Sequence, residues 1–347
     1  MTTTQRVKIG IVGLNFGRWI IEDIVNGPAK DYFELAAVCD KDEEKAKSFG
    51  EKFGVKVYTD LKDLLADADI PVVGLYTGPV NRAGLLRTIL HAGKDVMTTK
   101  PFELDPVAAR EILKEADKMG RVVHLNSPSP VPREHLLKIQ EWRKEYDLGA
   151  PVSCYGEVLA SYREKPDGTW YDNPELCPAA PIFRLGIYLI NDLVHLFGGV
   201  SEVQVTSSRL FTERPTPDNA QLGLLFKNNA IGNIYATFCV DDGQCYANSL
   251  ILHFERGSIQ HNIYPVSEVG KSNTSSRLTL VVRKSPEKIH VEDCELTSIG
   301  HGYQWDLFHA AVLRTQNIPT PIDDIVQGVE VIAALIRAQR SRATEKV

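Results

Sequence analysis

The stretch VKIGIVGLNFG, residues 7–17, decides the fold class. Residues 7–13 form a short apolar run that is typical of a buried strand, and it ends at Gly13, with Gly17 shortly after. Helical spacing of apolar residues follows over 16–25. A buried strand, a glycine-containing turn and a helix form the first half of a βαβ unit, which predicts a parallel sheet.

The same alternation continues as far as residue 125. Further buried runs predict strands at 34–40, 55–58, 71–76, 95–99 and 121–125, with helices between them at 43–53, 61–65, 82–92 and 106–119. Because parallel strands need crossover helices and crossovers are right-handed, this order predicts a doubly wound sheet. We therefore predict an α/β fold that begins with a Rossmann domain over residues 1–126.

The character of the sequence changes after residue 126. A Pro-rich linker, SPSPVPR, precedes a predicted helix and strand, and later apolar runs predict three hairpins, which turn at 228–229, 256–257 and near 286. Helices at 304–314 and 325–340 follow, and the basic end RAQRSRATEKV is interpreted as a solvated helix terminus. The second domain, 127–347, is predicted to be α/β with an open, mainly antiparallel sheet.

Composition excludes several classes of protein. The 347 residues include 39 Lys and Arg against 45 Asp and Glu, a net charge of −6. This balance argues against nucleic-acid binding, which needs a basic surface, and no run of about 18 apolar residues predicts a membrane span. Six scattered cysteines without CxxC spacing are expected to be free thiols in a reducing compartment. We expect a cytoplasmic protein with neither nucleic acid nor membrane as a partner.

The glycine turn suits a dinucleotide. Such a site needs a tight turn, a close approach of the backbone to the pyrophosphate and a helix N-terminus aimed at the phosphates. Gly13 fits the first requirement and Gly17 a later one, but Asn15 occupies the expected middle glycine position of GxGxxG. A plain strand-to-helix turn is the alternative interpretation.

Asp40 strengthens the dinucleotide interpretation. It ends the second buried run, where a carboxylate accepts hydrogen bonds from ribose hydroxyls and repels a 2′-phosphate. The predicted cofactor is therefore NAD, with NADP as the alternative because Lys41 is adjacent. A cap on the following helix is the other interpretation of Asp40. The residues predicted to bind the cofactor are Gly13, Asn15, Phe16, Gly17, Asp40, Lys41, Thr77 and Lys100.

Lys100 lies at the end of the fifth strand, in the segment DVMTTKPFELD. Ligands of a doubly wound sheet bind outside the carboxyl ends of its strands. Pro101 stiffens the turn, and X–Pro bonds are the ones that adopt the cis form. The alternative is a surface lysine in a loop.

The segment PIFRLGIYLINDLVHLFGG, residues 181–199, predicts a buried helix because it is apolar nearly all round. Arg184, Tyr188, Asn191 and His195 follow one another at spacings that place them on one face of an α-helix. An unsatisfied buried polar group costs roughly 1–3 kcal/mol. This stripe therefore either pairs with the other domain or lines a cavity.

The glycine turn, the acid after the second strand and the segment AGKDVMTTKPF resemble the Gfo/Idh/MocA oxidoreductases, over nearly the whole chain. In that family the lysine of this segment lies beside the nicotinamide and the reacting carbon, which implies a catalytic role for Lys100. Thr99 occupies the position of the family's glutamate. Arg82 stands near where many members have a histidine.

The predicted polar helix also matches a family motif. Members often carry D-x-G-x-H-x-x-D, whereas this chain has RLGIYLIN over residues 184–191. That form is similar to the branch of glucose–fructose oxidoreductase and the dihydrodiol and xylose dehydrogenases, in which Tyr replaces His as proton donor; the resemblance implies this role for Tyr188. A free tyrosine has a pKa of about 10, so a nearby cation, Lys100 or Arg184, would assist it.

Four residues are candidates for binding the substrate. Arg184 can bind a carboxylate with two parallel bonds or form a structural ion pair, and Asn191 can bind a hydroxyl or satisfy backbone groups. Trp170 lies in an aromatic loop that either faces a sugar ring or anchors itself, and Asn126 ends the sixth strand. His195 is interpreted as a packing residue. His301 and His309 lack ligand neighbours at suitable spacing, so no metal is predicted.

These features predict an NAD(P)-dependent oxidoreductase that transfers a hydride between nicotinamide and a secondary alcohol or ketone of a sugar-like or cyclic polyol substrate. A catalytically inactive NAD(P)-binding regulator and a redox-neutral, NAD-using glycosidase are the alternatives. The resemblance implies a homodimer or homotetramer formed through the C-terminal sheet.

Overall fold

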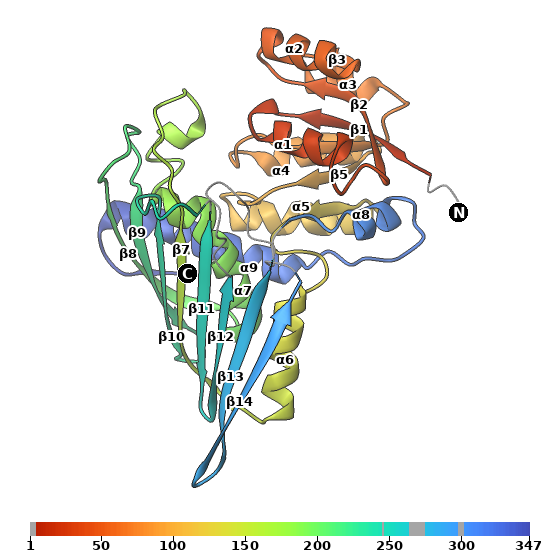
Figure 1. Ribbon diagram of the computed structural model, residues 1–347. Helices are drawn as coiled ribbons and strands as arrows, with labels where there is room; N and C mark the ends of the chain where they lie inside the picture. Colours follow the sequence, from red (N-terminus) through yellow and green to blue (C-terminus); the bar gives the residue numbers. More distant parts are fainter. Residues whose placement is uncertain (1–4, 245, 264–274, 298–301) are drawn as a thin grey trace. The chain divides into compact units, whose positions relative to one another are not determined.

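The computed structural model describes residues 5–244, 246–263, 275–297 and 302–347 (Figure 1). The chain divides into two compact units. The N-terminal unit combines Met1–Val131 with Gly302–Asp323, and the C-terminal unit combines Pro132–His301 with Asp324–Val347. The sequence predicted one division, at residue 126, and did not predict that a late segment returns to the first unit.

The N-terminal unit contains a parallel six-stranded sheet in the order β3-β2-β1-β4-β5-β6. Its strands are β1 (Val7–Val12), β2 (Phe33–Cys39), β3 (Lys56–Tyr58), β4 (Val72–Leu75), β5 (Asp95–Thr98) and β6 (Val123–Leu125). The predicted doubly wound sheet is therefore confirmed. The strand order changes direction between β1 and β4, so the crevice expected to take a ligand lies beyond the ends of these two strands.

Helices alternate with these strands as predicted. They are α1 (Leu14–Val25), α2 (Glu43–Phe53), α3 (Leu61–Ala66), α4 (Arg82–His91) and α5 (Pro106–Lys118). Three of them begin with an aspartate whose carboxylate accepts a main-chain N–H of the first turn, at Asp42, Asp60 and Asp105. These caps explain why the sequence places the helix starts well.

The returning segment completes the core of the N-terminal unit. It contains α8 (Trp305–Val312), whose Phe308 stacks on Phe33 of β2 with ring centroids 5.2 Å apart. Trp305 packs against the same phenyl ring at 5.7 Å. All three rings are buried. The first strands therefore depend on residues about 270 positions later in the chain.

The C-terminal unit contains a nine-stranded sheet in the order β14-β13-β12-β11-β7-β10-β9-β8-β15. The strands are β7 (Pro151–Leu159), β8 (Val200–Ser208), β9 (Asn219–Phe226), β10 (Ile231–Thr237), β11 (Ala247–Phe254), β12 (Gly257–Ile263), β13 (Ser276–Ser285), β14 (Lys288–Leu296) and β15 (Glu345–Lys346). All pairs are antiparallel except β7 with β10. The three predicted hairpins are confirmed as β9–β10, β11–β12 and β13–β14.

Three helices accompany this sheet: α6 (Glu134–Glu145), α7 (Ile187–Phe197) and α9 (Ile322–Ser341). Helix α7 packs closely on β7 at Gly156. A Cβ atom added there would lie 2.8 Å from a methyl carbon of Leu189. The basic end is the largely exposed last turn of α9 as far as Ser341, as predicted, but the strand that follows it was not predicted. Helix α9 ends at Ser341, and β15 then pairs with β8. None of the helices in the described ranges has the length and apolarity needed to cross a lipid bilayer.

Candidate cofactor and catalytic residues

The turn after β1 requires glycine for steric reasons. Gly13 has φ 87°, and a Cβ atom there would lie 2.8 Å from the carbonyl carbon and oxygen of Tyr76. A Cβ atom on Gly17 would lie 2.7 Å from a methyl carbon of Ile11. Gly13 thus permits the tight turn and Gly17 the close packing of helix on strand, which are two of the three glycine functions in a dinucleotide turn.

Asp40 connects the end of β2 to the start of α1. Its carboxylate accepts the N–H of Leu14 at 2.8 Å and the N–H of Asp42 at 3.1 Å. The interpretation of Asp40 as a cap of the following helix is wrong, because Asp42 caps α2 by accepting the N–H of Lys45. A carboxylate offers about four acceptor positions, so these two bonds leave capacity for ribose hydroxyls.

The other predicted cofactor residues gather at the same edge of the sheet. The Asn15 side-chain oxygen, in place of the expected middle glycine, accepts a hydrogen bond from the Lys45 ammonium at 2.9 Å. Phe16 packs against Tyr76, with ring centroids 5.7 Å apart. Thr77 follows Tyr76 after the end of β4, and Lys41 is exposed. Their contacts with a cofactor stay predictions.

Lys100 follows β5, and the Lys100–Pro101 peptide bond is cis. Its N–H donates to the side-chain oxygen of Asn126 at 3.4 Å, and the Thr99 hydroxyl donates to the same oxygen at 3.3 Å. Asn126, predicted to bind substrate, is buried, with 5% of its surface exposed. In this structure it holds the backbone at Lys100, and its contact with a substrate stays a prediction.

The predicted single α-helix over 181–199 is interrupted. A π turn covers Ile182–Gly186, and α7 begins only at Ile187. A π turn carries more residues than an α turn, so Arg184 does not continue the face that α7 defines. The prediction of one polar stripe is therefore wrong.

The members of that stripe contact three different elements. Arg184 binds Glu164, in the loop after β7. Asn191 packs closely against Gly328 of α9. A Cβ atom added to Gly328 would lie only 2.2 Å from the side-chain oxygen of Asn191. The ring nitrogens of His195 contact Gln140 of α6 at 2.9 Å and Asp324 of α9 at 2.7 Å. Asn191 and His195 thus join helices to one another within the C-terminal unit.

Tyr188 lies in the first turn of α7, near a cation that sequence reasoning missed. Burial lowers the pKa of Arg133, while negative charge on Asp192 and Tyr188 raises it, which shows that the three groups are electrostatic neighbours. Asp192, one turn after Tyr188, also contacts His135 at 3.2 Å. In the sequence Arg133 ends the Pro-rich linker, and its position directly before the predicted helix is the one signal for this role.

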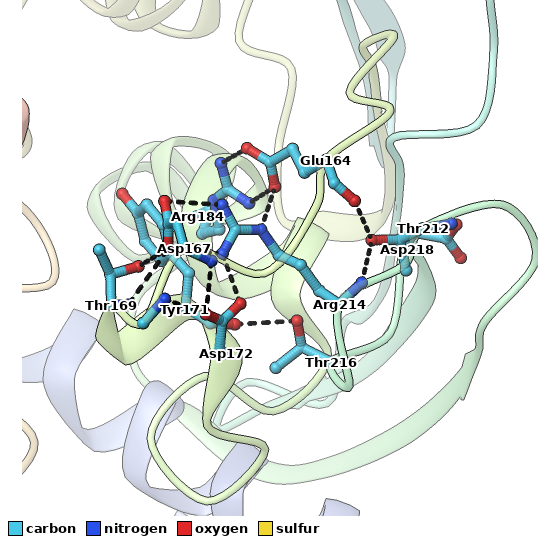
Figure 2. A network of polar contacts seen from close by, with 11 residues as sticks. Glu164, Asp167, Thr169, Tyr171, Asp172, Arg184, Thr212, Arg214, Thr216 and Asp218 are labelled. Atoms are coloured by element: carbon cyan, nitrogen blue, oxygen red, sulfur yellow. Dashed lines mark hydrogen bonds and ion pairs between the residues drawn. The ribbon is translucent and has the colours of Figure 1, made fainter.

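Arg184 belongs to a partly buried ion-pair network (Figure 2). Its guanidinium donates to both carboxylate oxygens of Glu164, at 2.5 and 2.8 Å, and lies 4.0 Å from the Tyr171 ring centroid. Burial opposes charge on both partners, but their pairing lowers the pKa of Glu164 and raises that of Arg184. This geometry favours the structural ion pair over a ligand for a substrate carboxylate.

Arg214, from the connection between β8 and β9, extends the network. It donates to Glu164 at 3.1 Å, to Asp167 at 2.9 Å and to Asp172 at 2.5 Å. Only 6% of its side chain is exposed. The sequence offered no signal for Arg214, because its three partners lie more than 40 residues earlier in the chain.

Trp170 lies in the loop that this network holds. It begins a 3₁₀ turn, Trp170–Asp172, and packs against Tyr171 at 4.4 Å and Phe183 at 6.0 Å between ring centroids. These contacts fit the interpretation of a loop anchored by its own aromatic residues. The proposed contact of Trp170 with a sugar stays a prediction. In the described part of the chain, which does not include His301, no group of three or more His, Cys, Asp or Glu residues could hold a metal ion.

Comparison with protein families decides the identity of both regions. Residues 7–127 match the Gfo/Idh/MocA model described as an oxidoreductase family with an NAD-binding Rossmann fold. Residues 136–260 match the C-terminal domain of the same family. The chain belongs to the Gfo/Idh/MocA oxidoreductases. The resemblance carried by the glycine turn, Asp40 and the Lys100 segment is thus confirmed, and so is the NAD-binding character of the Rossmann domain.

Several Gfo/Idh/MocA-like proteins are similar to this chain. D-glucoside 3-dehydrogenase of Escherichia coli (strain K12) is 28% identical over 56% of this chain and 55% of its own length. D-apiose dehydrogenase of Paraburkholderia graminis is 25% identical over 60% and 54%, respectively. The chain thus spans about half the length of these curated relatives. WlbA dehydrogenase from Bordetella pertussis, in complex with NADH and UDP-GlcNAcA, has a TM-score of 0.71 at 16% identity over 99% of each chain, which shows a shared fold.

Proposed function

We propose that the protein is an NAD-dependent dehydrogenase that transfers a hydride between nicotinamide and a secondary alcohol or ketone of a sugar-like or cyclic polyol substrate. The observation that carries this proposal is the turn formed by Gly13 and Asp40 within a Gfo/Idh/MocA chain that keeps Lys100 and Tyr188. Relatives named as dehydrogenases of a glucoside and of apiose support a sugar-like substrate. No finding favours the regulator or the glycosidase.

The residues at the glycine turn fit NAD. A Cβ atom on Gly13 would meet the Tyr76 carbonyl group, so glycine keeps this turn tight, and the N-terminus of α1 would favour the negative charge of a pyrophosphate. Asp40 would accept the ribose hydroxyls. Bound nicotinamide supplies the hydride chemistry. The contribution of the chain is to bind, to orient and to move a proton.

We assign the proton to Tyr188 and the orientation of the reacting oxygen to Lys100. The Lys100 ammonium would donate to that oxygen and polarise it, while the Tyr188 hydroxyl exchanges its proton. Because Arg184 is paired with Glu164, we propose Arg133 as the cation of the C-terminal unit that favours proton exchange at Tyr188. Holding the reacting groups at near-attack distance supplies much of the rate.

The test begins with titrations of NADH and NADPH, followed by a screen of sugars, inositols and sugar acids for a change in nicotinamide absorbance. On the substrate found, Tyr188→Phe and Lys100→Ala should each lower kcat by about 100- to 10,000-fold. Tyr146→Phe, which removes a hydroxyl that donates to Glu292 at 2.6 Å, is the matched control and should leave kcat unchanged. Turnover that survives both catalytic substitutions would sink the assigned roles.

We also propose that a second copy of the chain associates with the outer face of the C-terminal sheet. This face exposes the side chains of Tyr155, Ile231, Ile289 and Val291, and association would remove them from water. Light scattering should give the mass of a dimer or tetramer, and Ile231→Lys should reduce it. The described cysteines are free thiols, which fits the cytoplasmic location that we propose.

A further inference from the structure

Arg82 is a buried cation in the N-terminal unit that the proposed chemistry does not use. It is the first residue of α4, and 1% of its surface is exposed. A buried guanidinium is costly unless its N–H groups are hydrogen-bonded. Its position therefore calls for a set of acceptors that the fold supplies.

Three main-chain carbonyl groups are among these acceptors. One terminal nitrogen of Arg82 donates to the carbonyl oxygens of Thr99 and Pro101, each at 2.5 Å. The other donates to the carbonyl oxygen of Thr77, also at 2.5 Å. Thr99 and Pro101 flank Lys100, and Thr77 follows β4. A single guanidinium thus ties the segment around the predicted catalytic lysine to the end of the neighbouring strand.

A second contact, made by Glu103, also joins the Lys100 segment to helix α4. Glu103 lies in the segment after Lys100, and 3% of its surface is exposed. Its carboxylate accepts the N–H of Ala83, the second residue of α4, at 2.7 Å and the N–H of Leu104 at 2.7 Å. Helix α4 therefore binds the Lys100 segment through Arg82, and that segment binds the helix N-terminus through Glu103.

The rest of this backbone is held as well. Asn126 accepts the N–H of Lys100, and the Tyr303 hydroxyl donates to the carbonyl oxygen of Thr98 at 3.1 Å. Side chains from three separate places in the sequence thus fix the backbone from residue 98 to 101. Because the backbone is fixed, the starting point of the Lys100 side chain is fixed too.

We propose that Arg82 and Glu103 form a reciprocal clamp that positions Lys100 for hydride transfer. This inference rests on the proposed function. Arg82 and Glu103 are positioning residues, since the clamp acts on the main chain of the Lys100 segment. The planar fork of arginine spans three carbonyl groups, and the single ammonium of a lysine does not.

Arg82→Lys is the decisive variant, because it keeps the charge and loses the fork. On the substrate found for the wild type, kcat should fall about 10- to 100-fold, since a misplacement of about 1 Å can cost 100-fold in rate. The Kd for NADH should change by a smaller factor than kcat, because the contacts of Gly13 and Asp40 are left intact. Glu103→Gln, which keeps an acceptor oxygen, should lower kcat by roughly 3- to 10-fold. Arg87→Lys, on the same helix but paired with the surface carboxylate of Glu115, is the control.

A second readout does not depend on turnover. Hydrogen–deuterium exchange of the peptide covering residues 96–104 should become faster in Arg82→Lys and Glu103→Gln, with the helices of the C-terminal unit unchanged. The rate at which an amine-reactive acylating reagent labels Lys100 should change as well, with Lys62 as internal reference. If Arg82→Lys does not fold, Glu103→Gln carries the same test.

The outcomes separate the clamp from the proposed function. Faster local exchange together with a loss of kcat that exceeds the loss of NADH affinity supports both. Faster exchange and altered Lys100 labelling in a protein that turns over no sugar support the clamp and refute the hydride-transfer assignment. Unchanged exchange at 96–104, or a kcat within twofold of wild type in Arg82→Lys, overturns the clamp.

Discussion

Buried arginines occur in both units, and their partners differ. Arg82, in the N-terminal unit, donates to carbonyl groups beside Lys100. Arg184 and Arg214, in the C-terminal unit, bind the carboxylates of Glu164 and its neighbours (Figure 2). Carbonyl partners fix a backbone path without cancelling charge, whereas carboxylate partners cancel it. A cation whose charge is cancelled in this way is a poor ligand for an anionic substrate.

The largest expected effect comes from removing the charge of Arg214. Arg214→Met would leave Asp167 and Asp172 without this cation, whereas Glu164 keeps Arg184, and losing hydrogen bonds to a charged group typically costs about 1.5–3 kcal/mol. The free energy of unfolding, measured by urea denaturation, should fall by that amount, while the folded variant keeps its affinity for NADH. A decrease in the free energy of unfolding of less than about 1 kcal/mol would mean that water replaces the ion pairs of Arg214. The contrast between Arg82 and Arg214 would then fail.

Next in size is the steric demand of the glycine turn. Gly13→Ala places a Cβ atom against the Tyr76 carbonyl group at a positive φ, so the turn must move away from its present path. We expect the Kd for NADH to rise about 10- to 100-fold in a calorimetric or fluorescence titration. Gly54→Ala, also at a positive φ but with open space around its Cβ position, is the control for strain alone. Equal losses of NADH affinity in the two variants would count against the turn as the cofactor site.

A smaller effect is expected at Arg184. Because its two bonds to Glu164 leave it paired, Arg184→Lys should lower stability by about 1–2 kcal/mol. The ratio of kcat/KM for a sugar acid to that for the matching neutral sugar should stay within about twofold of wild type. A selective loss for the sugar acid would show that Arg184 binds a substrate carboxylate after all.

The smallest effect concerns pH. Arg214 is the main cause that lowers the pKa of Asp167, and it also lowers that of Glu164. Carboxylates whose folded pKa lies below the unfolded value contribute stability above about pH 4, and that contribution is lost as pH falls through the folded pKa. The stability difference between wild type and Arg214→Met should therefore shrink as pH is lowered from 6 to 3 in denaturation curves. A constant difference over this range would argue against ionic pairing.

Local features explain how much of the fold was predictable. The strands of the N-terminal unit are short apolar runs, and helices such as α2 and α5 begin at aspartate caps, so sequence pattern and structure agree within a few residues. Gly13 and Gly17 were identifiable from the strand–turn–helix pattern. The structure gives the physical reason, because a Cβ atom at either position would clash with its neighbours. The aspartate caps act between near neighbours in sequence, and the positive φ of Gly13 is a constraint on a single residue.

The errors arose where the constraint acts at long range. The π turn before Tyr188 changes the periodicity over only five residues, too few to detect in a helical pattern. The structural ion pair was one of the two interpretations of Arg184, but its partner Glu164, 20 residues earlier, was not identifiable from the sequence. The positioning roles of Arg82 and Asn126 depend on β4, β5 and β6 lying side by side, which sequence pattern predicts only at the level of the sheet.

The return of Gly302–Asp323 to the N-terminal unit has a consequence for biosynthesis. Phe33 is made early, yet its buried partners Trp305 and Phe308 leave the ribosome only near the end of the chain of 347 residues. At a synthesis rate of roughly 5–20 residues per second, the apolar surface around Phe33 stays unpaired for about 15–55 s before Trp305 and Phe308 are made. The nucleotide-binding unit therefore finishes folding after most of the C-terminal unit has been synthesised, and the nascent chain is a natural client for chaperones until then.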